Sequence, residues 1–102
     1  MYRPIKIILK DILNNEEIKR INMKSVNDVV VEKILTIMKE QKLTQYMLSQ
    51  KSGVSFSTIK SIMQRKTNNI TLKTLIMICD GLNISPSDFL NDDAFLAENL
   101  DI

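Results

Sequence analysis

Histidine and tryptophan are absent from this chain of 102 residues, which contains one cysteine and two glycines. Without histidine, the histidine-based triads, the Cys–His dyads and the usual zinc sites are excluded. Gly53 and Gly81 lie too far apart for a glycine-rich phosphate-binding loop. The single Cys79 cannot form an internal disulfide, and we expect it to be a small core residue. The sequence therefore predicts no enzyme activity, no catalytic residues, no metal site and no cofactor.

Long apolar runs are also absent. No run approaches the length of a membrane span, and the opening M-Y-R-P-I-K-I-I-L-K-D is interrupted by charge too soon for a signal peptide. A lone cysteine gives no sign of an oxidising compartment. We expect a cytoplasmic protein of one domain that does not associate with membranes.

Charge is distributed unevenly along the chain. Five acidic residues and no basic ones lie between Asp88 and the end, whereas residues 1–87 carry 14 basic and 7 acidic residues. A basic body with an acidic tail suits a polyanionic partner. A solvated surface with a charged tail has the same composition, so charge alone does not decide the function.

The most informative stretch runs from Leu43 to Ile62 and reads L-T-Q-Y-M-L-S-Q-K-S-G-V-S-F-S-T-I-K-S-I. Thr44 is a helix N-cap residue before a helix over Gln45–Lys51, which Ser52 and Gly53 end. Ser55 caps a second helix that begins at Phe56. Apolar spacing places five side chains toward a core: Met47, Leu48, Ile59, Ile62 and Met63. Two short helices joined by a turn with glycine form a helix-turn-helix unit.

Three more segments have helical patterns. A helix capped by Ser25 or Asn27 runs to about Gln41, with an apolar stripe of Val30, Ile34, Ile37 and Met38. A helix from Thr71 or Leu72 ends at Gly81 as its C′ residue, with apolar positions at Leu72, Leu75, Ile76 and Cys79. The last helix has Ser85 as its cap and Pro86 in its first turn, and its closing residues are Phe89 and Leu90.

Residues 1–24 form an N-terminal extension, residues 25–90 the helical domain and residues 91–102 an acidic tail. Ile5, Ile8 and Ile12 have helical spacing, but the run I-K-I-I-L is also compatible with a strand. Asn14 and Asn15 mark a turn. Such an apolar extension is expected to cover the domain or a second subunit, unless the chain begins naturally at Met23. The tail is either disordered or contacts a partner.

The run L-T-Q-x-x-L-S-x-x-S-G-V-S-x-S-T-I-x-x-I resembles the Cro/CI-type (lambda-repressor-like, Xre) helix-turn-helix family. The run T-L-K-T-L-I-M-I-C-D-G-L-N-I-S-P-S-D-F-L resembles the fourth and fifth helices of the same family. The resemblance covers Val29 to Leu90 and implies an all-α, five-helix, lambda-repressor-like DNA-binding bundle. Met38 and Met63 depart from the family pattern, because many members pair an Arg with a Glu there. Gln64-Arg65-Lys66 also replaces the glycine that often follows the recognition helix.

The resemblance implies that the recognition helix, about residues 55–65, enters the major groove of double-stranded DNA. It assigns base contacts to Phe56, Ser57 and Ser61, with Lys60 nearby. Phe56 either contacts a thymine methyl group or folds back against Tyr46. Phosphate contacts are expected from helix N-termini and cations, and the candidates are Lys42, Thr44, Gln45, Ser55, Thr58, Arg65, Lys66 and Asn68.

Two functions fit these expectations. The first is a sequence-specific transcriptional regulator that acts as a repressor and binds a palindromic site as a homodimer. The alternative is the antitoxin of a toxin–antitoxin pair, which would bind its toxin through the N-terminal extension or the acidic tail. A toxin reading frame beside this gene would favour the second function.

Overall fold

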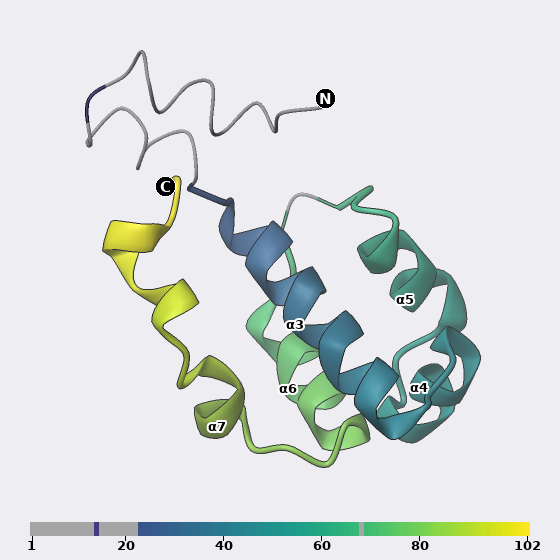
Figure 1. Cartoon of the computed structure of the whole chain (residues 1–102). Helices are drawn as coiled ribbons and strands as arrows, with labels where there is room; N and C mark the ends of the chain where they lie inside the picture. Colours follow the sequence, from purple (N-terminus) through teal and green to yellow (C-terminus); the bar gives the residue numbers. More distant parts are fainter. Residues whose placement is uncertain (1–13, 15–22, 68) are drawn as a thin grey trace, which may run out of the picture.

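The computed structural model describes residues 14, 23–67 and 69–102, so most of the N-terminal extension predicted for residues 1–24 lies outside the described residues. The described part is helical and contains no strand (Figure 1). Its five α-helices confirm the predicted all-α fold. They and two short 3-10 helices are α3 (Val26–Gln41), α4 (Gln45–Ser52), α5 (Phe56–Met63), α6 (Leu72–Gly81), α7 (Pro86–Leu90), η1 (Asp93–Phe95) and η2 (Ala97–Asn99).

Each of the five α-helices begins after a hydroxyl side chain. Three of these caps were predicted, and the structure selects Ser25 rather than Asn27, and a start at Leu72 after Thr71, where the sequence left alternatives open. The side-chain oxygen accepts a hydrogen bond from the backbone N–H three residues further on, at 3.0 to 3.2 Å. These bonds satisfy amide groups that have no partner within the helix. The capping residues are Ser25, Thr44, Ser55, Thr71 and Ser85.

The chain leaves four of the five described α-helices through left-handed residues, and one of these four residues is a glycine. Gly53 ends α4 with φ 76°, and the other three are Lys42, Arg65 and Asn83 with φ of 56°, 56° and 57°. The prediction that Gly81 is the C′ residue of its helix is wrong. Helix α6 includes Gly81, and the left-handed turn follows two residues later at Asn83.

Gly81 is required by packing between α4 and α6 rather than by backbone conformation. A Cβ atom at Gly81 would lie 2.8 Å from both the backbone N and the Cβ of Ser52. Ser52 is itself buried at the end of α4, and its Oγ accepts a hydrogen bond from Val54 N–H at 3.1 Å. The two helices therefore approach so closely that no side chain fits between them.

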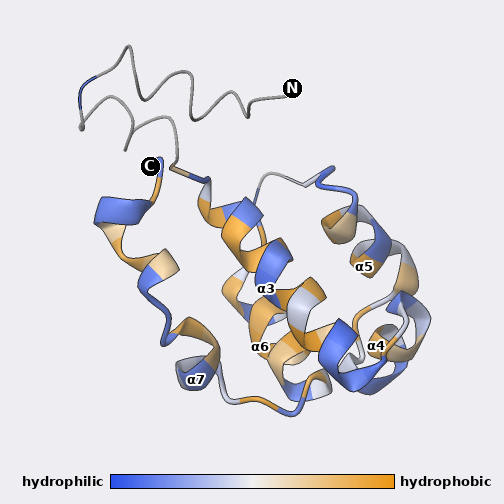
Figure 2. Ribbon diagram, in the orientation of Figure 1, coloured by the Kyte–Doolittle hydropathy of each residue, from blue (hydrophilic) through white to orange (hydrophobic). Residues whose placement is uncertain are grey.

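Apolar side chains from all five helices form one buried core. Along the ribbon, hydrophobic and hydrophilic residues alternate within the helices (Figure 2). Residues with no exposed surface include Ile34, Leu48, Ile59, Ile78 and Phe89. Cys79 is also fully buried, as predicted, and burial raises the pKa of its thiol. A thiol that remains protonated is a poor nucleophile, so Cys79 acts as a core residue.

Helix α6 turns a different face to the core from the one predicted. Leu75 and Cys79 are buried as expected, but Leu72 is 66% exposed and Ile76 is 45% exposed. Ile78 completes the buried face. The five consecutive residues from Leu75 to Cys79 are all apolar, so spacing alone cannot select the buried face of α6, whereas the contact between Gly81 and Ser52 does. Met47 and Leu90, also predicted to be core residues, are exposed too.

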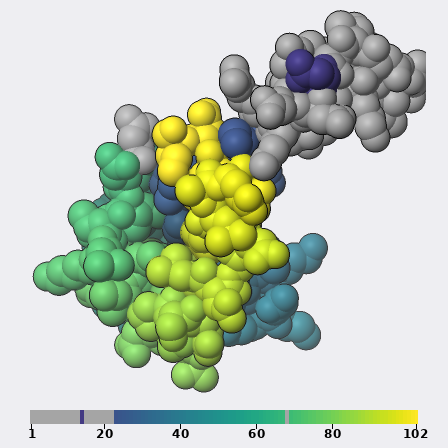
Figure 3. Space-filling view, turned by 90° about the vertical axis from the view of Figure 1, so that its left-hand side faces the viewer, coloured from purple at the N-terminus to yellow at the C-terminus, as the bar shows by residue number. Residues whose placement is uncertain are grey.

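The acidic tail packs against α3 instead of extending into solvent. Lys24 and Leu100 form a parallel bridge, and Asp101 N–H donates to the Lys24 carbonyl at 2.9 Å. Figure 3 shows the C-terminal segment lying over this side of the bundle. Leu100 is buried, and the Phe95 ring lies 6.0 Å from that of Phe89.

Lys33 and Asp92 join this tail to α3. Lys33 Nζ lies 3.0 Å from Asp92 Oδ2 and 5.6 Å from the centroid of the Phe89 ring. The Ala94 N–H, and then the Lys33 ammonium, lower the pKa of Asp92 from its ordinary value of 3.8. Both groups interact best with the ionised carboxylate, so the ionised form of Asp92 favours the packed tail.

We predict that Gly81→Ala destabilises the protein by about 1 to 3 kcal/mol, the usual effect of overpacking a core. The added methyl group would meet the backbone of Ser52, which cannot move aside as a flexible side chain would. Denaturant unfolding would measure the loss. Asp80→Ala, at an exposed position of the same helix, is the control and should stay close to wild type. Equal stability of both variants would contradict the close approach.

We predict that the tail loosens as the pH falls through the lowered pKa of Asp92. A carboxyl group with a lowered folded-state pKa contributes its full stability above the ordinary pKa and loses it below the folded value. NMR signals of Leu100 and Asp101, followed from pH 6 to pH 2, should report this change. Asp92→Asn should weaken the packing already at pH 6, whereas Glu98→Gln in the same segment should behave as wild type.

Candidate nucleic-acid interface

Helix α5 is held by its apolar side and presents the opposite side to solvent. Ile59, Ile62 and Met63 are buried, and α4 packs against both α5 and α6. The predicted base-contacting residues lie outside this core: Phe56, Ser57 and Lys60 are exposed, and Ser61 is half-buried. The side of α5 that carries these residues therefore does not contribute to the core and is available to contact a ligand.

Phe56, at the start of α5, contacts a ring from α4. The centroids of the Phe56 and Tyr46 rings are 5.9 Å apart, and the ring planes meet at 72°. This edge-to-face geometry is a favourable arrangement of two aromatic rings. Phe56 nevertheless keeps 44% of its surface exposed and Tyr46 keeps 56%. The contact with Tyr46 thus forms while Phe56 remains accessible, so the two sequence-based alternatives do not exclude each other.

The predicted phosphate-contacting hydroxyls lie at the N-termini of the two motif helices. Thr44 Oγ1 accepts from Met47 N–H at 3.1 Å. Ser55 Oγ accepts from Thr58 N–H at 3.2 Å and bonds Thr58 Oγ1 at 2.8 Å. These side chains fix the helix starts. The N-terminus of α4, with half-buried Gln45 as its first residue, carries the partial positive charge that favours a phosphate.

The cations predicted to contact phosphate flank these helices. Lys42 ends α3, and Arg65 and Lys66 follow α5; all three are exposed. The predicted Asn68 lies outside the described residues. Arg65 N–H and Lys66 N–H donate to the carbonyls of Ile62 and Ser61 at 3.0 Å, which closes the end of α5. Arg65 has the left-handed conformation, with φ of 56°, within the stretch Gln64-Arg65-Lys66 that stands in place of the glycine expected after this helix.

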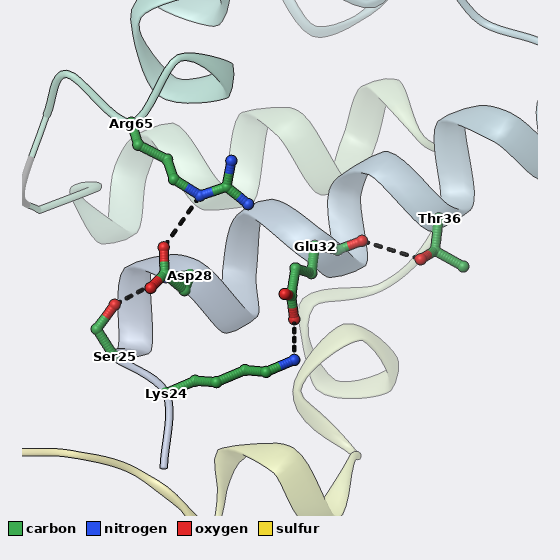
Figure 4. Close-up of polar contacts among 6 residues, drawn as sticks. All are labelled: Lys24, Ser25, Asp28, Glu32, Thr36 and Arg65. Atoms are coloured by element: carbon green, nitrogen blue, oxygen red, sulfur yellow. Dashed lines mark hydrogen bonds and ion pairs between the residues drawn. The ribbon is translucent and has the colours of Figure 1, made fainter. Parts of the chain in front are cut away.

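Arg65 also contacts α3 through an ion pair (Figure 4). Its Nε lies 3.0 Å from Asp28 Oδ1, and both side chains are more than 40% exposed. An exposed ion pair contributes about 1 kcal/mol at most. A phosphate that approaches Arg65 can therefore replace or share this contact at little energetic cost.

The two methionines that replace the family's Arg and Glu are both part of the core. Met38 and Met63 are buried and belong to the same apolar cluster. A partly buried ion pair is often no more stabilising than good apolar packing. The replacement therefore leaves the position of α5 on the bundle intact.

The sequence analysis missed two residues of this surface as candidate site residues, Tyr46 and Gln50. Gln50 Nε2 donates to Tyr46 Oη at 2.9 Å, across one turn of α4. Their i, i+4 spacing was visible in the sequence, and contact of Phe56 with Tyr46 was one of two alternatives there, but the sequence did not decide between them. Within the described residues, no group of acidic, Cys or His side chains is placed to hold a metal ion. No helix in that part of the chain is long and apolar enough to cross a membrane.

These features define a helix-turn-helix domain with an exposed second helix. A family model for the Cro/C1-type helix-turn-helix DNA-binding domain matches residues 33–94. The match covers more than half of the chain, so the protein belongs to this family. It begins and ends a few residues later than the resemblance read from the sequence. No curated protein and no solved structure matches the chain. Membership of this family supports a DNA-binding regulator of transcription.

Proposed function

We propose that the protein is a sequence-specific repressor that binds a palindromic operator as a homodimer, with α5 in the major groove. The observation that carries this proposal is the division of α5 into a buried apolar side and an exposed side of Phe56, Ser57 and Lys60. A helix has the right width for the major groove, and residues near its N-terminus reach base edges. Occupation of a promoter by such a dimer would block transcription there.

Phosphate contacts on both sides of α5 would set its register on the DNA. On one side lie Lys42 and the N-terminus of α4 with Gln45; on the other lie Arg65 and Lys66. Contacts of this kind position the protein without reading sequence. They also release counterions, which makes binding dependent on salt.

A homodimer suits this domain because one short recognition helix touches few base pairs. A groove of about 660 Å³ lies between the starts of α3 and α6 and the C-terminal segment. Four exposed apolar side chains line it: Val26, Leu72, Leu90 and Ile102. We propose that a second copy of the chain covers these residues, which would hold two recognition helices for the two halves of a palindrome.

An antitoxin role is the alternative. Of the two features that favour it, the acidic tail packs on the protein's own α3, and the N-terminal extension lies outside the described residues. The discriminating observation is genetic: a small toxin reading frame beside this gene would favour the alternative. The proposed location is the cytoplasm, where either role is carried out.

We predict that binding to a random-sequence duplex weakens steeply with salt and that Gln45→Ala/Lys66→Ala reduces the slope. Removal of one phosphate-contacting cation should lower the slope of log K against log salt by about 0.9. Fluorescence anisotropy over a salt series would measure it. Lys24→Ala is the control, because Lys24 pairs with Glu32 beside the tail. If the wild type does not bind even at low salt, the DNA-binding proposal is wrong.

We predict that the wild type is a dimer in sedimentation equilibrium and that Leu72→Asp makes it monomeric, because the new charge would be buried in the interface. Ile76→Asp is a matched control: Ile76 is also exposed on α6 but does not line the groove. A dimer that survives Leu72→Asp would place the interface elsewhere. A monomeric wild type would contradict the homodimer itself.

A further inference from the structure

We infer that Tyr46 and Phe56 together form an apolar reader for the C5-methyl group of thymine in the major groove. The inference rests on the proposed DNA-binding function and specifies what its recognition surface detects. Within the sequence-reading face of B-DNA, thymine alone among the four unmodified bases presents a methyl group. An apolar surface at the tip of the recognition helix is complementary to that group and to no hydrogen-bonding edge.

The two rings form a small assembly from two helices. Phe56 is the first residue of α5, and Tyr46 lies in the first turn of α4. The ring centroids lie 5.9 Å apart in an edge-to-face arrangement, and Gln50 Nε2 donates a hydrogen bond to Tyr46 Oη at 2.9 Å. About half of each ring remains exposed. The exposed apolar surface therefore has a defined position, although it lies outside the core.

The remaining side chains of this face discriminate bases less well. Ser57 and Ser61 have hydroxyl groups that either donate or accept, so they tolerate several base edges. Ser57 Oγ also lies 3.3 Å from Ser55 Oγ, within the cap of α5. Lys60 ends in a flexible point charge. The Phe56 ring is thus the one group of these four with both a fixed position and a chemical preference.

Tyr46 acts as a positioning residue in this assembly. An unsupported Phe56 would lose rotamer freedom when it contacts DNA, and that loss would weaken binding. The edge-to-face contact with Tyr46 restricts the Phe56 ring before binding. The hydrogen bond from Gln50 in turn restricts Tyr46. Only the ring of Tyr46 contacts Phe56, and the hydroxyl acts on Phe56 indirectly, so loss of the ring should matter more than loss of the hydroxyl.

The test begins with selection of preferred duplexes from a random library by the full chain. Each thymine of the selected sequence is then replaced by deoxyuridine, which removes only the methyl group. We expect one position in each half-site at which binding falls about fourfold, the effect of one buried methyl group. A C·G pair placed there should bind less well, and 5-methylcytosine should restore part of the loss.

Variants assign the methyl effect to the two rings. Phe56→Ala should bind thymine and uracil sites equally. Phe56→Leu should keep part of the preference for thymine, and it controls for the possibility that Phe56→Ala fails to fold. Tyr46→Ala should reduce the preference, and Tyr46→Phe should retain it. Lys66→Ala is the control, because loss of a phosphate contact should weaken both sites by the same factor.

The outcomes separate this inference from the proposed function. Failure to bind any duplex would overturn both. A selected operator with no uracil-sensitive position would leave the DNA-binding function standing and overturn the methyl reader. A uracil effect that persists unchanged in Phe56→Ala would assign the methyl contact to another residue and overturn it as well.

Discussion

The close approach of α4 to α6 is the constraint on which the rest of the domain depends. With no side chain at Gly81, the backbone of α6 contacts Ser52 directly. This contact fixes the rotation of α6, which buries Ile78 and leaves Leu72 at the surface. It also fixes α4, whose left-handed Gly53 sets the direction in which α5 begins. The α4–α6 contact thus influences the orientation of α5 indirectly, in addition to the packing of Ile59, Ile62 and Met63 of α5 itself.

The helix starts were more predictable from sequence than the helix ends, although the ends at Gln41 and at Gly53 were predicted correctly. A hydroxyl residue before an apolar pattern is a local signal, and the five caps obey it. Left-handed Lys42 and Arg65 give no such signal, because residues of these types are disfavoured there by about 1 to 2 kcal/mol, whereas Asn, as at Asn83, tolerates this conformation better. Surrounding contacts impose that conformation. For Arg65 they include the carboxylate of Asp28, which is distant in sequence.

The core was predictable where apolar residues alternate with polar ones. Val30, Ile34 and Met38 follow one stripe of α3 and are buried as expected. Val29 and Val31 are buried too, although the pattern placed them beside the stripe. The C-terminal segment packs along α3 and buries more of its surface. The local sequence of α3 contains no pattern that predicts this contact. The exposed side of α5 was predictable by elimination, because Ile59, Ile62 and Met63 of this helix are buried in the core. The pairing of Phe56 with Tyr46 depends on the angle between two helices and was left open.

The chemistry of the recognition surface explains why assembly would matter for this protein. Two serines, one lysine and a supported aromatic ring supply few groups that distinguish one base pair from another. A methyl contact is worth about 0.8 kcal/mol, far less than the 4 to 10 kcal/mol that separates specific from non-specific binding in typical regulators, about 10³- to 10⁷-fold. Phosphate contacts raise affinity for all sequences equally. Two copies of the chain would double the free energy of sequence-specific binding, although each copy uses the same few side chains. In the proposed dimer, the exposed apolar groove beside Leu72 and Leu90 would therefore contribute to sequence recognition as much as α5 itself.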